Sequence, residues 1–164
     1  MSLEIGISLV CPVYCSAQTL RILVDEICTC LNSTHKFEIL LIDDRSPDSS
    51  WLEISQISKE NSAVRGIRLG RNVGQHGALL AGIRSARFDK IVTIDDDLQN
   101  PPSEVIKLVQ ALDSNGGVVY GVSTDVKQKW WRKASSTGAK QLFKKFLSFD
   151  SAVKISSFRA FETN

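Results

Sequence analysis

Short apolar runs alternate with segments of helical periodicity along most of this 164-residue chain. The runs are rich in β-branched residues, which predicts buried strands, and they lie at 5–13, 37–42, 64–69, 88–94 and 117–122. Between them, apolar residues recur at helical intervals, as Leu20, Leu23 and Ile27 do. Strands and helices that alternate at this spacing predict an α/β fold with a mostly parallel sheet and right-handed crossovers.

The composition of the chain is that of one soluble globular domain. Hydrophobic residues make up 43% and charged residues 23% of it, and both values are ordinary for such domains. No apolar run approaches the roughly 18 residues that a membrane-spanning helix requires. The first residues also lack the basic and apolar regions of a signal peptide. We therefore expect the chain to be cytoplasmic.

The net charge of +2 conceals two regions of opposite charge. Residues 1–125 contain 11 Lys and Arg against 16 Asp and Glu, whereas residues 126–164 contain nine against two. In residues 126–149 the basic side chains alternate with tryptophans and phenylalanines. Two interpretations stay open: a solvated helix whose aromatic side chains enter the core, or a surface for anionic lipid head groups. Nucleic acid could use the same chemistry, but no nucleic-acid-binding fold is evident.

Acidic residues follow directly on the apolar run at 88–94. Because successive strand residues alternate between the two faces, we expect Asp95, Asp97 and Gln99 to project together from the carboxyl edge of the sheet. Open α/β sheets bind ligands at that edge. Neighbouring carboxylates repel one another unless a cation lies between them. The pattern predicts a divalent metal that holds a diphosphate, with Asp96 facing away in a structural role.

Two further loops are expected at the same edge of the sheet. Asp43 and Asp44 follow the run at 37–42, where they form either a simple turn or a carboxylate that accepts from a nucleobase or ribose. We favour the second interpretation, for Asp44 more than for Asp43. Residues 71–77 join a strand to a helix and include Gly74. A glycine there lets the backbone approach a ligand, and a helix N-terminus favours anions.

Several motifs occur in an order that resembles one known family. They are 11–14 (CPVY), 42–48 (IDDRSPD), 71–76 (RNVGQH), 95–102 (DDDLQNPP), 130–133 (WWRK) and 157–161 (SFRAF). The chain resembles the family 2 inverting glycosyltransferases of GT-A fold, and among them the polyprenyl-phosphate glycosyltransferases. The resemblance implies a three-layer, Rossmann-like sandwich with a mostly parallel central sheet over residues 1–164. It also implies a C-terminal truncation, since relatives continue further.

The resemblance implies roles for individual residues. The catalytic group would be Asp95, Asp97, Gln99 and Arg132, with Asp97 and Gln99 nearest to Mg²⁺ or Mn²⁺. Arg132 would face the acceptor phosphate or the donor diphosphate. A second set would bind the nucleotide sugar or lie on the acceptor side: Pro12, Tyr14, Asp44, Asn72, Gly74, Asp95, Ser157 and Arg159.

The implied activity is metal-dependent, inverting transfer of a sugar from a nucleoside diphosphate to a polyprenyl phosphate at the cytoplasmic face of a membrane. UDP is favoured over GDP. Residues 1–125 would form the nucleotide-sugar side, and residues 126–164 the acceptor and membrane side. Two alternatives stay open: a fragment that binds nucleotide sugar without turnover, and a family 2 enzyme with a saccharide acceptor. The chain departs from the family pattern at 15–17, where relatives carry an acidic residue, and at Ser123, where many carry arginine.

Overall fold

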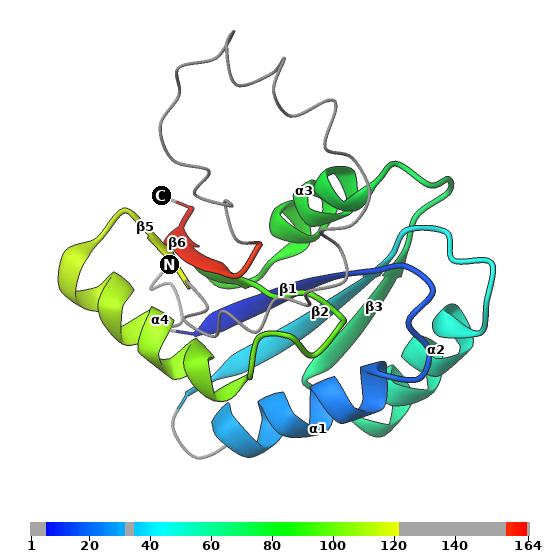
Figure 1. Cartoon of the computed structure of the whole chain (residues 1–164), viewed down its shortest axis with the longest axis horizontal. Coiled ribbons are helices and arrows are strands. Elements are labelled where there is room, and N and C mark those ends of the chain that lie inside the picture. Colours follow the sequence, from blue (N-terminus) through cyan, green and yellow to red (C-terminus); the bar gives the residue numbers. More distant parts are fainter. Residues whose placement is uncertain (1–5, 32–34, 122–156, 164) are drawn as a thin grey trace, which may run out of the picture. The chain divides into compact units, whose positions relative to one another are not determined.

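A computed structural model describes residues 6–31, 35–121 and 157–163, in which a six-stranded sheet carries four helices (Figure 1). The strands are β1 (Ile7–Val13), β2 (Phe37–Asp43), β3 (Val64–Arg68), β4 (Lys90–Thr93), β5 (Val118–Tyr120) and β6 (Arg159–Glu162). The helices are α1 (Leu20–Leu31), α2 (Ser50–Glu60), α3 (Gln75–Ser85) and α4 (Ser103–Asn115). Strand and helix alternate from β1 to β5, as the apolar runs predict.

The sheet has the strand order β3-β2-β1-β4-β6-β5, with β1 near its centre. β1 pairs in parallel with both β2 and β4, and β2 pairs in parallel with β3. β6 lies between β4 and β5 and runs antiparallel to both. The α/β fold with a mostly parallel sheet is therefore confirmed.

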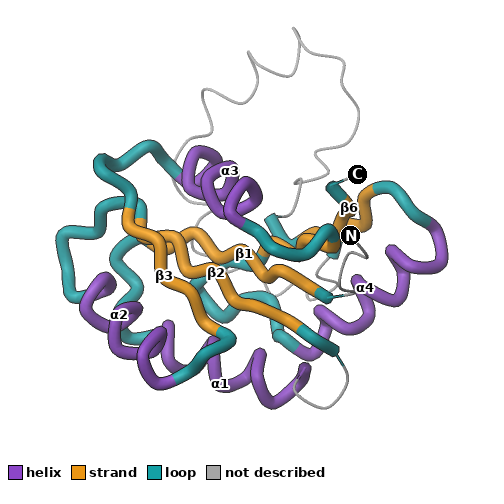
Figure 2. Tube along the Cα trace, turned by 180° about the vertical axis from the view of Figure 1, so that it is seen from behind, coloured by secondary structure: helices purple, strands orange, loops and turns teal. Residues whose placement is uncertain are grey.

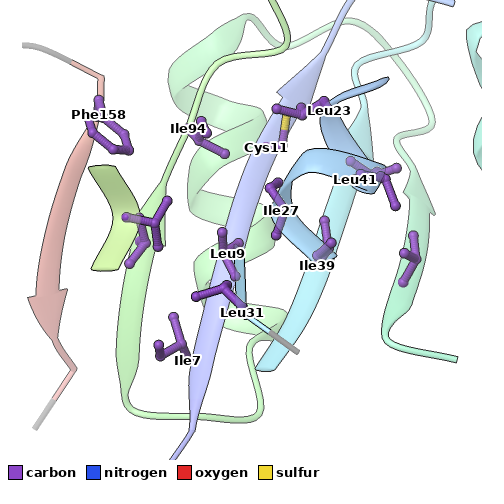
Figure 3. Close-up of a cluster of buried hydrophobic side chains, with 14 of the residues drawn as sticks. Ile7, Leu9, Cys11, Leu23, Ile27, Leu31, Ile39, Leu41, Ile94 and Phe158 are labelled. Atoms are coloured by element: carbon purple, nitrogen blue, oxygen red, sulfur yellow. The ribbon is translucent and has the colours of Figure 1, made fainter. Parts of the chain in front are cut away.

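Helices cover both faces of the sheet. Helices α1, α2 and α4 pack on one face, in a hydrophobic cluster that includes the β1 residues Leu9 and Cys11. Helix α3 packs on the other face, in a cluster that includes Val10 (Figure 2). Figure 3 shows side chains of α1, such as Ile27, packed against those of β1 and β2. Because both faces are buried, the central strands are apolar along their whole length rather than alternating.

A buried carboxylate is compensated at the amino end of the sheet. Glu38 of β2 is 3% exposed. Its Oε1 accepts from the Ser8 hydroxyl at 2.8 Å and from the Arg87 backbone N–H at 2.6 Å, and its Oε2 accepts from Arg65 Nη1 at 2.7 Å. These donors replace the water that the charge loses on burial. Glu38 is thus satisfied within the fold and is not available to a ligand. The carboxylates that line a cleft lie at the opposite, carboxyl edge of the sheet.

The predictions for residues 126–149, including Arg132, lie outside the described residues. Among the residues that are described, no helix is both long and apolar enough to cross a membrane.

Gly82 lies where α3 approaches the sheet closely. A Cβ at this position would lie 2.4 Å from Cγ1 of Val10 and 3.0 Å from Cγ1 of Ile42, and both side chains are fully buried. We predict that Gly82→Ala lowers the free energy of unfolding by about 1–3 kcal/mol through overpacking. This loss occurs even though alanine is the better helix former by about 1 kcal/mol.

Gly70→Ala, in the loop that precedes this helix, is the control for this substitution. A Cβ there would have no atom within 4 Å, and Gly70 does not have a positive φ. Urea unfolding compares the two variants. If both retain the wild-type free energy of unfolding, α3 is not packed on the sheet as closely as described.

Candidate active site

A cleft of about 510 Å³ opens at the carboxyl edge of the sheet. Its lining comes from the ends of β1, β2 and β4 and from the loop that leads from β3 into α3. The lining residues are Pro12, Val13, Tyr14, Asp44, Asn72, Gly74, Gln75, Asp95, Asp96 and Asp97. Ligands bind at this edge in open α/β sheets, at the point where neighbouring connections diverge.

The cleft gathers most of the residues that the sequence singles out. Seven of them line it: Pro12, Tyr14, Asp44, Asn72, Gly74, Asp95 and Asp97. Three lining residues were not assigned to ligand binding: Val13, Gln75 and Asp96. The signal for Gln75 is its place in the 71–76 motif, as the first residue of α3 directly after Gly74. The sequence cannot show which neighbour its side chain reaches.

Asp95 is held by donors from two distant segments. Nε2 of Gln75 donates to Oδ1 of Asp95 at 2.8 Å, and the Ser157 hydroxyl donates to Oδ2. The Ser157 backbone carbonyl in turn accepts from the hydroxyl of Thr93 on β4. Ser157 does not line the cleft, but these bonds attach it to the acidic edge.

Asp96 holds neighbouring loops together, although it also lines the cleft rather than facing away from it as strand alternation predicts. Its Oδ2 accepts from the Tyr14 backbone N–H at 3.2 Å and from the Ser16 hydroxyl, and its backbone carbonyl accepts from Thr19 Oγ1 at 2.7 Å. Burial raises the pKa of Asp96 above its ordinary value, although both donors to its carboxylate act in the opposite direction. Asp96 therefore joins the end of β4 to the loop between β1 and α1.

Asp97 lies in a turn rather than at the end of a strand. β4 ends at Thr93, and Leu98 has a φ of 58°. The expectation that strand alternation carries Asp95, Asp97 and Gln99 to one face is therefore wrong in its premise. A left-handed residue and a turn place Asp97 instead, and its Oδ1 accepts from the Gln99 backbone N–H at 3.0 Å. Asp97 is exposed and lines the cleft, whereas Gln99 does not line it.

Asp44 anchors the loop that enters α3. Its side chain is 3% exposed; Oδ1 accepts from the Val73 N–H at 2.7 Å, and Oδ2 accepts from the Gly74 N–H at 2.8 Å. Gly74 has a φ of 81°, a left-handed conformation that favours glycine at this position. One lone pair remains on each carboxylate oxygen for a further donor. The sequence predicts that Asp44 contacts a ligand, and it does not predict this structural role.

Asp43, the neighbour of Asp44, is fully buried. Its Oδ1 accepts from the Ser46 N–H at 3.0 Å, and its Oδ2 lies 3.1 Å from Arg68 Nε. The Arg68 guanidinium lies 5.7 Å from the centre of the Trp51 ring. These contacts make Asp43 part of the scaffold under the loop.

Two of the lining residues offer surfaces to a ligand. Tyr14 is 52% exposed, so its ring can stack on a planar group. Asn72 is also exposed, and its Oδ1 accepts from the Gly74 N–H at 3.2 Å. Aromatic, amide and carboxylate groups thus surround one opening, a donor set suited to a nucleoside and a phosphate-bound cation.

Arg159 lies beside the cleft rather than in it. It is paired with Thr93 of β4 in the sheet register, and its guanidinium lies 5.9 Å from the centre of the Phe161 ring. Its Nε is buried without a hydrogen-bond partner among the residues described. Arg132, which is predicted to face the acceptor phosphate or the donor diphosphate, is outside these residues.

The described residues contain no group of three or more His, Cys, Asp or Glu arranged to enclose a metal ion. This fits a particular kind of site. Mg²⁺ and similar hard cations are often held by one or two carboxylates together with substrate phosphates and water rather than by a cage of side chains. Asp97 lines the cleft with an exposed carboxylate, whose oxygens are suited to be metal ligands of this kind.

Residues 8–163 match the sequence profile of the family described as glycosyl transferase family 2. The match covers nearly the whole chain, and the fold and cleft agree with it, so the chain belongs to glycosyltransferase family 2. Its mostly parallel α/β sheet matches that of GT-A glycosyltransferase structures.

Solved structures share this fold. The mannosyltransferase PcManGT from Pyrobaculum calidifontis, in complex with GDP-Man and Mn²⁺, matches with a TM-score of 0.64 and 20% identity over 74% of this chain. S. aureus TarS, residues 1–349 in complex with UDP, matches with a TM-score of 0.60 and 18% identity over 76% of it. The chain spans 36% of the mannosyltransferase and 40% of that TarS chain. At these identities the likeness extends to the fold alone.

The two hydrogen bonds that Asp44 accepts from the loop generate a testable prediction. Asp44→Asn places an amide NH₂ group against one of the two backbone N–H donors. We predict a loss of about 1–3 kcal/mol in the free energy of unfolding, with faster hydrogen exchange at Val73 and Gly74. The exposed Asp25 of α1 supplies the control, Asp25→Asn. Unchanged exchange at both amides in Asp44→Asn would rule out the anchoring role.

Proposed function

We propose that this chain is the donor-binding part of a metal-dependent, inverting glycosyltransferase whose acceptor is a polyprenyl phosphate. The observation that carries the proposal is the cleft, which brings Tyr14 and Asp44 together with Asp95 and Asp97 from three different strand ends. Family membership supplies the reaction class. The finer assignments below are supported by the residues around the cleft and by the polyprenyl-phosphate resemblance of the sequence.

The nucleoside of the donor would lie on the β1 and β2 side of the cleft. Tyr14 offers an exposed ring for stacking on the base, beside Pro12, and Asp44 retains one lone pair per oxygen for a base or ribose donor. Asn72 and Gly74 line the same side. The structural neighbours contain GDP-Man in one case and UDP in the other, and we favour UDP, as the resemblance of the sequence implies.

The diphosphate would lie on the β4 side, beside Asp95 and Asp97. An anionic diphosphate and these carboxylates repel each other, so a cation between them is required. Asp97, with Gln99 after a change of side-chain position, would hold Mg²⁺ or Mn²⁺ there. A cation bound at this place stabilises the negative charge that develops on the leaving diphosphate, as a Lewis acid.

The acceptor would approach from the side of β6. Ser157 contacts Asp95, and Arg159 lies on the adjoining strand. The Gly121 N–H donates to the Phe158 carbonyl at 2.9 Å, so the described residues that flank segment 122–156 lie at the carboxyl edge. This segment includes Arg132 and eight of the twenty Lys and Arg residues of the chain, but only two acidic residues, Asp125 and Asp150. We therefore divide the chain into a donor-binding part, 1–125, and an acceptor-facing part, 126–164.

Charge explains why a phosphate acceptor suits this site. In the transfer, a phosphate oxygen forms a bond to the anomeric carbon while the bond from that carbon to the nucleoside diphosphate breaks on the opposite face, so the configuration inverts. A phosphate monoester has its second pKa near 6 and is already ionised at neutral pH. A general base is then less necessary than for a hydroxyl acceptor.

Calorimetric titration of UDP, GDP and their sugars, with and without Mn²⁺, tests donor binding by the full chain. We expect tighter binding with Mn²⁺ than without it. Asp97→Asn should lose at least about tenfold of the Mn²⁺-dependent gain in affinity, because it removes an anionic oxygen ligand. Asp25→Asn, on the exposed face of α1, is the control. If Asp97→Asn keeps the full Mn²⁺ dependence of nucleotide binding, Asp97 is not a ligand of the metal.

One second candidate has a specific observation in its favour. The chain spans only 36% of the mannosyltransferase and 40% of the TarS chain that it matches, so it could bind nucleotide sugar without transferring it. Release of nucleoside diphosphate in the presence of a polyprenyl phosphate separates the two candidates. Turnover with a saccharide and not with the lipid phosphate would contradict the proposed acceptor.

The basic, aromatic segment is expected to contact the membrane surface. We predict binding to vesicles that contain anionic phospholipid, with each Lys or Arg worth about 1 kcal/mol near the surface. Changing Lys127, Lys129 and Lys133 to Gln together should therefore weaken binding by at least about tenfold. The matched control changes the same number of basic residues outside the segment: Lys36, Lys59 and Lys107. Equal vesicle binding by the two triple variants in co-sedimentation would contradict a membrane-facing segment.

A further inference from the structure

Three consecutive residues connect the two sides of the cleft. The backbone N–H groups of Val73 and Gly74 donate to the two oxygens of Asp44, and the side chain of the next residue, Gln75, donates to Asp95. Asp44 follows β2 and Asp95 follows β4, and these strands lie on opposite sides of β1. The loop after β3 therefore spans the carboxyl ends of all three strands.

Asp95 is more restrained than Asp97. Each oxygen of Asp95 accepts from a protein side chain, Gln75 at Oδ1 and Ser157 at Oδ2. For Asp97 only the bond from the Gln99 N–H to Oδ1 is described, and the residue is exposed. The terminal torsion of an aspartate is broad and roughly two-fold, so donors on both oxygens are needed to fix the plane of its carboxylate.

We infer that Gln75 is a positioning residue for Asp95, and that Ser157 completes the same clamp. Gln75 acts through the carboxylate rather than on the reacting atoms. The clamp fixes Asp95 toward the diphosphate side of the cleft and leaves Asp97 as the carboxylate open to a cation. This inference rests on the proposed function, since it assigns a role in donor binding.

The position of Gln75 makes it suited to this role. It is the first residue of α3, and the preceding two residues are fixed by Asp44, so its backbone is held while its side chain reaches Asp95. The same bonds make the β2 and β4 sides of the cleft dependent on one loop. In the proposed function the cation lies between the diphosphate and both carboxylates, so Asp95 faces it beside Asp97. Removing a partner that orients a carboxylate at a metal typically changes metal affinity by about 10–100-fold.

The test is calorimetric titration of UDP and GDP into the full chain with Mn²⁺ and without it. Gln75→Leu keeps the size of the side chain and removes the donor. We expect about a tenfold loss of Mn²⁺-dependent nucleotide affinity and less than about a twofold change without the metal. Gln110→Leu is the matched control, because Gln110 is exposed on α4 and does not line the cleft.

A double-substitution cycle separates positioning from a general effect on the fold. If Gln75 acts through Asp95, Gln75→Leu has no further effect on affinity in an Asp95→Ala background. Ser157→Ala should repeat the loss, and Ser157→Thr, which keeps the hydroxyl, should restore part of it. If Gln75→Leu does not fold, the comparison of Ser157→Ala with Ser157→Thr tests whether the hydrogen bonds to Asp95 affect nucleotide affinity.

The outcomes distinguish this inference from the proposed function. If the wild-type chain binds neither UDP nor GDP with Mn²⁺, the proposed function fails and the inference fails with it. If the wild type binds and Gln75→Leu binds equally well, the inference alone is overturned. It is likewise overturned if the losses from Gln75→Leu and Asp95→Ala are additive, or if Ser157→Ala and Ser157→Thr lose affinity equally.

Discussion

The parallel pairing of β1 with both β2 and β4 is the constraint on which the site depends. Parallel strands end at the same edge of a sheet, so this pairing brings residues 12–14, Asp44 and Asp95 to one opening. The pairing is possible because β1 is buried on both faces, with α1 on one side and α3 on the other. Core and cleft are therefore two consequences of one strand arrangement.

Most of the architecture could be predicted from the sequence, because apolar runs and helical spacing report burial directly. The five runs from 5–13 to 117–122 correspond to β1 through β5. The acid-rich strand ends were also predictable, since parallel strands share their carboxyl edge. What strand alternation could not give was the course of the chain after Thr93, where the left-handed Leu98 replaces the extended backbone.

The contacts within the site were less predictable, because they join segments far apart in the chain. Ser157 and Asp95 are separated by 62 residues, and Asp44 and Gly74 by 30. No local pattern shows that Asp44 accepts two backbone N–H groups or that Gln75 turns toward Asp95. The aspartates consequently differ in burial and hydrogen bonding, which the sequence does not show. Asp43, Asp44 and Asp96 hold loops together, whereas Asp97 remains exposed.

The insertion of β6 between β4 and β5 has a consequence for the order of folding. In the part of the chain that is described, β5 pairs with β6 alone, and β6 is the last strand in the sequence. A growing polypeptide on the ribosome would thus complete β1 to β4 while β5 still lacked a neighbour. Pairings between residues so distant in sequence form slowly, since the intervening chain must first be closed into a loop. The sheet can be finished only after synthesis has passed residue 162, when the edge next to Asp95 also gains Ser157.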